Sequence, residues 1–438
     1  MWRLWIKIRA YLGEQLWMRP ALASLISIAL AAAALYMGRL YEGPLPIELS
    51  SEALKDLLSI FASSMLAVAT FSVSAVVTSV ASVSNSATPR AARLILSDHT
   101  TQNVLSSFIA AFIYSIVGIL ALEAFPFDRV GRFIIFSGLA IIVGWVLAAF
   151  VHWIDHVTKL GRVETAVDKI SHAASVALIP TNVGSWGAHI YAGSPPAAAA
   201  VVAAGEVGYV TSLNVRGLQE LATDLDVAIY MTVRPGDFVD TMSPIAYLTP
   251  VSAAVRQRVE DVQKHVAVDV SRAHDQDIRF GLVSLAETAD RALSSAINDP
   301  GTAIVILGRQ LGLITKWVEV LRSEETREIL YGSIYIPPLT AAEIVRESFT
   351  PIARDGAGAV EVGIKLQKTL AALIRLDEQE LTEAAVEMSD IALQLSNHAL
   401  ISDVHKARIE EVAKEVNRLA NARSDAERNL AANDGVNF

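Results

Sequence analysis

Four long stretches without a single charged side chain occupy the first third of this chain. A helix needs about 20 apolar residues to cross a hydrocarbon core of about 30 Å. Because a backbone inside lipid must satisfy its own hydrogen bonds, each stretch predicts a membrane-spanning α-helix. The absence of Asp, Glu, Lys and Arg from all four disfavours a pump with an ionisable relay inside the membrane. The stretches run from Pro20 to about Gly38, from Leu57 to Pro89, from Thr100 to Leu122 and from Phe133 to Val151.

Lys and Arg gather at alternate ends of these stretches, which predicts their orientation. Cytoplasmic flanks of membrane helices are enriched in Lys and Arg. Residues 39–56 are net acidic and are expected outside, so the pattern predicts an inside N-terminus, four spans and an inside C-terminal region. The inside positions would be Arg3, Lys7, Arg9, Arg19, Arg90, Arg93, Lys159, Arg162 and Lys169.

The remaining chain differs sharply in composition, which predicts several domains. The chain carries a net charge of −10 over 438 residues, and nearly all of its charge follows residue 155. Such asymmetry is typical of a membrane domain joined to a soluble one. The predicted layout is an interfacial amphipathic segment (1–19), a transmembrane domain (20–154, helices near 20–38, 57–84, 102–122 and 133–154), a helical connector and loop (155–200), a small β-rich module (201–275) and a helical domain (276–438).

The fold class follows from this layout. Residues 201–275 contain short segments rich in Val, Ile and Tyr between glycines and prolines, as strands do. From Ile278 to the end the apolar residues recur at helical spacing, so this part is expected to be mostly helical. We therefore predict an α-helical membrane domain of four transmembrane helices plus a cytoplasmic α+β region, with a small β-rich module followed by a helical bundle.

The second stretch is unusually rich in Ser, Thr and Ala. Its small side chains allow two interpretations. They permit close helix packing with hydrogen bonds between helices. Alternatively, a shared hydroxyl face could surround a water-filled pore in an oligomer, with Ser63, Thr70, Ser74 and Thr78 as pore-lining candidates. These four, with Ala67, recur at spacings of three and four and share one helix face.

The inner ends of the second and fourth stretches carry two candidates for a pore mouth. Arg90 either sets topology and meets lipid phosphate, or forms a basic ring at the mouth. His152 lies beside Asp155 and His156, at spacings that place all three on one helix face. Two such histidines with an Asp can bind zinc, yet a polar helix end at the interface explains the same pattern. We predict no metal site.

The junction RALSSAINDPGTAI, residues 291–304, is built like a corner between two helices. Ile297 is expected to close the first helix. Asn298 tolerates left-handed geometry, Asp299 is a good N-cap, and Pro300 suits the first helical position. The alternative interpretation is an anion or partner site, because a helix N-terminus offers free N–H groups. Its candidate residues are Asp277, Asn298, Asp299 and Thr302, and the acidic turn HDQD around Asp277 either binds a cation or faces solvent.

The longest motif is HDQDIRFGLVSLAETADRALSSAINDPGTAI, which contains this junction. It resembles the signature of a bacterial family of predicted membrane proteins, domain of unknown function 2254. Ser295 departs from the family, in which proline is expected. The resemblance implies an integral protein of the bacterial inner membrane and supplies no mechanism. Further matching stretches are QLWMRPAL, SVSNSATPRAARLILSD, FVHWIDH and FTPIARDGAGAV.

The motifs favour no enzyme and no cofactor. The chain has no cysteine, P-loop, dinucleotide glycine fingerprint or G-x-S-x-G motif. Its negative charge disfavours nucleic acid as a partner. Two hypotheses remain: a homo-oligomeric channel with a cytoplasmic gating domain, or a membrane-anchored sensor or scaffold that binds a ligand or partner protein. The expected partners are the lipid bilayer, further copies of the chain and a small or anionic ligand.

Overall fold

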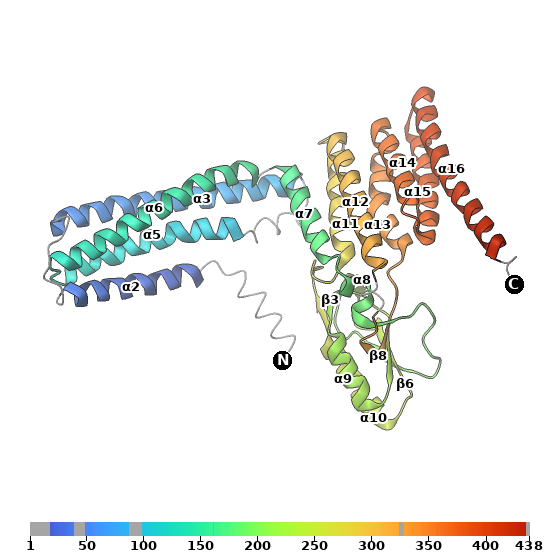
Figure 1. Ribbon diagram of the computed structural model, residues 1–438, viewed down its shortest axis with the longest axis horizontal. Helices are drawn as coiled ribbons and strands as arrows, with labels where there is room; N and C mark the ends of the chain where they lie inside the picture. Colours follow the sequence, from blue (N-terminus) through green and yellow to red (C-terminus); the bar gives the residue numbers. More distant parts are fainter. Residues whose placement is uncertain (1–17, 39–48, 87–98, 161, 324–327, 435–438) are drawn as a thin grey trace. The chain divides into compact units, whose positions relative to one another are not determined.

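The structure, a computed structural model, describes residues 18–38, 49–86, 99–160, 162–323 and 328–434. The chain divides into two compact units, with the division between Ala166 and Val167. We call them the membrane unit, which precedes this division, and the α/β unit, which follows it. The predicted interfacial segment 1–19 lies almost entirely outside the described residues. Each unit is described by itself below (Figure 1).

The membrane unit is made of long apolar helices, as predicted. Three described stretches are long and apolar enough to cross a bilayer, Ser51–Ser82, Thr101–Ala124 and Arg129–Lys159, and a shorter apolar helix covers Ser24–Met37. Of the four predicted spans, the structure therefore supports the last three, and it has a shorter apolar helix at the place of the first. The helices that contain these stretches are α2 (Met18–Gly38), α3 (Ser51–Ser86), α5 (His99–Ala124) and α6 (Arg129–Leu160).

Small residues and one tyrosine bring these helices together. Leu54 and Leu58 of α3 are fully buried, and a Cβ on Gly118 of α5 would lie 3.1 Å from Leu58. The Tyr114 hydroxyl donates a hydrogen bond of 2.7 Å to the carbonyl of Ile135, across from α5 to α6. Inside a bilayer the hydrophobic effect between helices is weak, so close packing and such bonds hold the unit together.

The α/β unit contains two small sheets, in which β4, β6 and β2 are antiparallel neighbours and β8 runs parallel to both β1 and β4. The five-stranded sheet has the order β1-β8-β4-β6-β2, and the three-stranded sheet has the order β5-β3-β7. The strands are β1 (Ala188–Ile190), β2 (Ala200–Ala203), β3 (Gly208–Leu213), β4 (Ala228–Met231), β5 (Phe238–Val239), β6 (Pro244–Thr249), β7 (Val266–Asp269) and β8 (Tyr331–Ile336).

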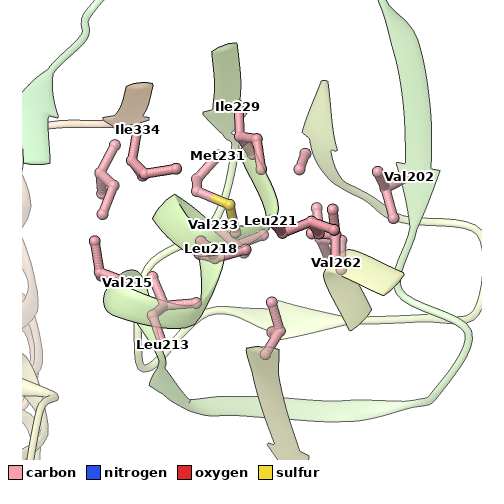
Figure 2. Close-up of a cluster of buried hydrophobic side chains, with 14 of the residues drawn as sticks. Val202, Leu213, Val215, Leu218, Leu221, Ile229, Met231, Val233, Val262 and Ile334 are labelled. Carbon is pink, nitrogen blue, oxygen red and sulfur yellow. The ribbon is translucent and has the colours of Figure 1, made fainter. Parts of the chain in front are cut away.

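Helix α9 (Val215–Leu225) supplies much of the core of this part. Its strong amphipathic pattern puts Leu218 and Leu221 on one side, where they are buried with Ile229 and Met231 of β4 (Figure 2). Asn214 caps the helix by accepting a hydrogen bond from the N–H of Gly217. Burial of a Leu or Ile side chain contributes about 1.5–3 kcal/mol, so this cluster holds α9 on the strands.

Strand β8 interrupts the helices that make up most of the described chain after Ile278, and we did not predict it from the sequence. It lies between two helical segments of the sequence yet inserts between β1 and β4. On its outer face the ring of Tyr335 stacks on Tyr230 at 4.4 Å and on His189 at 4.9 Å. The alternation of YGSIYI, residues 331–336, was the only local signal for a strand. Pairing with the distant strands β1 and β4 makes this segment a strand.

The other helices of the α/β unit form layered pairs. α13 packs between α11 and α15, and α14 contacts α12, α15 and α16. In Figure 1 these helices stand side by side, coloured yellow to red. Besides α9, the helices of the α/β unit are α7 (Val163–Ala177), α8 (Pro180–Val183), η1 (Ser185–Gly187), α10 (Ala253–Arg258), η2 (Val259–His265), α11 (Ile278–Leu293), α12 (Pro300–Leu321), α13 (Ala341–Asp355), α14 (Val360–Ile374), α15 (Gln379–Ala399) and α16 (Asp403–Asp434).

Candidate functional site

Helix α3 has two distinct faces within the membrane unit. One face is buried against the neighbouring helices and carries Leu54, Leu58, Ala62, Met65, Ala69 and Ser72, each at most 8% exposed. The opposite face is exposed and carries the predicted pore-lining residues with one alanine between them: Ser63, Ala67, Thr70, Ser74 and Thr78. The structure thus brings all four candidates together on a helix face that no described residue covers.

The four hydroxyls already have partners on their own helix. Thr70 and Ser74 donate to the carbonyls four residues earlier, at 2.9 and 3.1 Å, and Thr78 does the same at 2.9 Å. Ser63 donates to the carbonyl of Ile60 at 3.0 Å. Back-bonded hydroxyls tolerate an apolar medium, and each oxygen still has a free lone pair to accept a hydrogen bond from water or another helix.

Of the two candidates for the inner mouth of a pore, the structure describes only His152. Arg90 lies outside the described residues. His152 is exposed near the end of α6, and Asp155 pairs with Lys159 at 2.8 Å. His156 faces Thr101 of α5, with 3.2 Å between the imidazole Nε2 and the hydroxyl. Among the described residues no three His, Asp or Glu side chains converge as a metal site would require.

The corner at Asn298–Asp299–Pro300 has the predicted local geometry. Asn298 adopts a left-handed φ of 51°, and Asp299 caps α12, which begins at Pro300. The Asp299 carboxylate accepts from the N–H of Thr302 at 3.1 Å and from its hydroxyl at 2.6 Å. These bonds, that from the hydroxyl first, lower the pKa of Asp299. The Asp299 carboxylate therefore takes the N–H and the hydroxyl of Thr302, which an anion bound at this helix end would need.

One detail of the corner was predicted wrongly. Helix α11 ends at Leu293, not at Ile297, because Ser294 leaves helical geometry with a ψ of 148°. The Ser294 hydroxyl donates to the carbonyl of Arg291 at 2.7 Å, and such a local bond competes with helix continuation. Residues 295–299 are all exposed.

The cap predicts a measurable pH dependence. Replacement of Asp299 by Ala should cost about 1 kcal/mol at neutral pH, the usual value of an N-cap. Because the folded-state pKa of Asp299 lies below its ordinary value of about 3.9, the stabilisation is present above pH about 4 and is lost as the pH falls through the folded pKa. Urea unfolding of wild type and variant at pH 7 and pH 3 measures the difference in their free energies of unfolding. A difference that is the same at both pH values contradicts the prediction.

Asp277 lies at the opposite end of α11, where it caps the helix and pairs with Arg272. The helix is 16 residues long, about 24 Å, so the structure does not bring Asp277 together with Asn298, Asp299 and Thr302. Its carboxylate accepts two bonds from Arg272, at 2.6 and 3.0 Å, and a third from the N–H of Arg279 at 3.1 Å.

The burial of Asp277 corrects the interpretation of HDQD as a solvent-facing or cation-binding turn. Asp277 is 2% exposed and paired with arginine, while its neighbour Asp275 is exposed. Gly236, at a φ of +99°, lies so close that a Cβ there would be 2.5 Å from the carboxylate of Asp277. The turn thus closes on the loop that precedes β5.

Around Asp277 the structure shows a buried group of charges that the sequence did not reveal. Arg279 is 8% exposed and pairs with Asp237 at 2.6 Å and with Glu347 of α13 at 3.4 Å. Burial raises the pKa of Glu347, and none of the described residues forms a hydrogen bond with its second carboxylate oxygen. These pairs join the strand-rich part of the α/β unit to α11 and α13.

A third arginine, Arg234, lies near this group. Burial, followed by repulsion from Arg279, lowers the pKa of Arg234 to about 10. Its guanidinium lies 5.0 Å over the ring of Trp186 and donates to the Ser185 hydroxyl at 3.1 Å and to the Pro337 carbonyl at 2.5 Å. Ser185 and Trp186 both adopt a φ of 58°, which L-residues rarely do, so this contact fixes a strained turn.

The comparison with known families agrees with the sequence motifs. A family model described as "Predicted membrane protein (DUF2254)" matches residues 13–372. The chain belongs to the DUF2254 family. Both the exposed face of α3 and the buried charges around Asp277 lie within the matched residues. The family's description names no biochemical activity.

Individual relatives add no activity. The chain is 28% identical over 230 residues to an uncharacterized protein of Mycobacterium bovis and to one of Mycobacterium tuberculosis. The match covers 50% of this chain and 43% of each relative, so the chain spans less than half the length of these relatives. No solved structure matches the chain.

Proposed function

We propose that this DUF2254 protein forms a homo-oligomeric channel in the membrane, with the exposed face of α3 around a central pore. The observation that carries the proposal is the division of α3 into a buried apolar face and an exposed face with four hydroxyls. A helix whose outer face met only lipid would gain nothing from this concentration of hydroxyls. In a ring of copies the same face would be turned to water.

The length of this face supports the proposal. From Ser63 to Thr78 the helix rises about 22 Å, most of a hydrocarbon core of about 30 Å. Each hydroxyl oxygen keeps an acceptor site that could replace part of an ion's hydration shell. Large exposed apolar residues flank the hydroxyl face, among them Leu66 and Val73, and these suit contacts between copies or with lipid.

The topology belongs to the same proposal. We infer that α2 also spans the membrane, that both ends of the chain lie inside the cell and that the α/β unit gates the pore or filters what enters it. The Lys and Arg pattern supports this orientation. The protein acts in this proposal without enzymatic chemistry or a cofactor.

A cysteine scan tests the proposal directly, because the chain contains no cysteine of its own. Thr70→Cys and Ser74→Cys, each as the only thiol of the full chain, should react with a membrane-impermeant cationic thiosulfonate in lipid vesicles. The attached charge should reduce ion conductance in single-channel recordings, since it would sit in the pore. Val73→Cys is the matched control on the same turn of α3, and it should not react.

Two results would overturn the channel. Wild-type protein that shows no conductance at any voltage, tension or pH removes the function. Thiols at 70 and 74 that react no faster than the thiol at 73 place the hydroxyl face in lipid or between packed helices. Either result leaves the alternative, a membrane anchor for a sensing or scaffolding α/β unit.

A further inference from the structure

A large apolar cavity lies within the membrane unit, on a different side from the hydroxyl face of α3. Its volume is about 980 Å³, and its walls come from α2, α5 and α6. Two of the lining residues, Ile141 and Trp145, are 73% and 67% exposed, so the cavity opens sideways at α6. All of its lining residues belong to one compact unit.

The sequence of α5 explains why the cavity exists. The face of α5 that lines it carries Ser106, Ser107, Ala110 and Ala111, four small residues at helical spacing. Of the α6 residues opposite them, Trp145 reaches Ser107 through its indole N–H at 3.2 Å, and Ile141 and Ile142 complete the wall. Interiors normally pack without voids larger than a water molecule, so a cavity of this size in a membrane helix bundle requires an occupant.

The exposed side-chain amide of Asn103 lies at one end of the cavity. Ser107 donates to the Asn103 carbonyl at 2.8 Å and accepts from the Trp145 indole N–H at 3.2 Å. The side-chain amide of Asn103 is exposed and makes no hydrogen bond to the described residues. At the other end the Tyr114 hydroxyl donates to the Ile135 carbonyl and the Ser137 hydroxyl to the Phe133 carbonyl at 2.8 Å, so both hydroxyl protons are already used within the protein.

The depth of the cavity matches one leaflet. Asn103 is the third residue of the apolar stretch Thr101–Ala124, at the level of a membrane interface. From Asn103 to Tyr114 the helix rises about 17 Å, close to half of a hydrocarbon core of about 30 Å. An amphiphile with a polar group at the interface and a chain toward the midplane fits both the length and the polarity.

We propose that this cavity binds one acyl chain of a bilayer phospholipid, with the ester region of the lipid at Asn103 and Trp145. The bilayer surrounds the opening at α6, so a phospholipid is the amphiphile present there at the highest concentration. Trp side chains favour this interfacial depth. The site is independent of conduction by the hydroxyl face and stands if the channel fails.

Photolabelling tests the site. The full chain is placed in vesicles of phosphatidylethanolamine and phosphatidylglycerol that contain a little phosphatidylglycerol with a diazirine in one acyl chain. After illumination, peptides are mapped by mass spectrometry. Label should concentrate on residues 103–114 and 133–145 rather than on the outer face of α5 at Ile116 and Leu120. Ala110→Phe places a ring in the cavity and should remove most of that label.

A matched variant distinguishes the cavity from general contact with lipid. Ile116→Phe adds the same ring to the same helix at an exposed position and should leave the label at 103–114 unchanged. Equal labelling of both faces of α5, or equal loss in both variants, overturns the site. So does labelling by a diazirine fatty acid alone, which would make a free acid the ligand. Protection of the cavity by a second copy would overturn it as well.

Discussion

Replacement of Asp277 by Ala should destabilise the α/β unit by about 3–5 kcal/mol, the usual cost of removing one partner from a buried ion pair. The carboxylate is 1% exposed and takes two hydrogen bonds from Arg272, which is itself 12% exposed. Without it the guanidinium of Arg272 keeps its burial and loses its counter-charge. The variant also removes the N-cap of α11. Hydrogen exchange of α11 and α13 amides in the detergent-solubilised full chain measures the loss.

Two controls separate these contributions. Asp299→Ala removes the exposed cap of α12 and should cost only about 1 kcal/mol, because no buried charge is left behind. Asp277→Asn keeps a capping oxygen and removes the charge, so its loss of stability should lie between those of Asp277→Ala and Asp299→Ala. If Asp277→Ala costs no more than Asp299→Ala, the buried charges do not hold α11 to the strands.

Much of the fold was predictable, and the two exceptions have different physical causes. The long apolar helices, the caps at Asp299 and Pro300 and the helical pattern of α12 to α16 depend on local sequence. The end of α11 follows from a local bond of Ser294 that helical periodicity does not reveal, whereas strand β8 depends on distant strands. β8 is stabilised by stacking of Tyr335 on Tyr230, more than a hundred residues earlier, which periodicity cannot reveal.

The candidate sites show the same division. Helical arithmetic placed Ser63, Thr70, Ser74 and Thr78 on one face, and the structure has them so. Helical spacing could not tell which face of α3 is buried, because that depends on how α3 packs against the other helices. Charge pairs near in sequence, such as Arg272 with Asp277, could have indicated the buried group of charges. The role of Arg234 could not be predicted, because its partners Trp186 and Pro337 come from distant segments.

The burial of Asp277 also gives the junction motif a physical meaning. One end of α11 carries a buried ion pair and the other an exposed, well-capped corner. The first end fixes the helix to the strands. The second leaves residues 295–299 exposed.

Replacement of Gly281 by Ala should destabilise the α/β unit by about 1–3 kcal/mol, the range for overpacking a tight contact. Gly281 lies on α11 where α7 passes, and a Cβ there would be 2.2 Å from the Cβ of Ala174. Neither atom belongs to a flexible side chain, so the two helices must separate. Urea unfolding of the full chain, followed by hydrogen exchange of α7 and α11, gives the size of the effect.

A second substitution shows whether that contact is the cause. Ala174→Gly should cost about 1 kcal/mol alone through lower helix propensity, yet in the Gly281→Ala background it should restore much of the lost stability, because it removes the clashing atom. Gly308→Ala, in α12 with nothing within 4 Å of the added Cβ, should instead stabilise by about 0.5–1 kcal/mol. Simple additivity of the changes at 174 and 281 would show that α7 and α11 do not depend on this close approach.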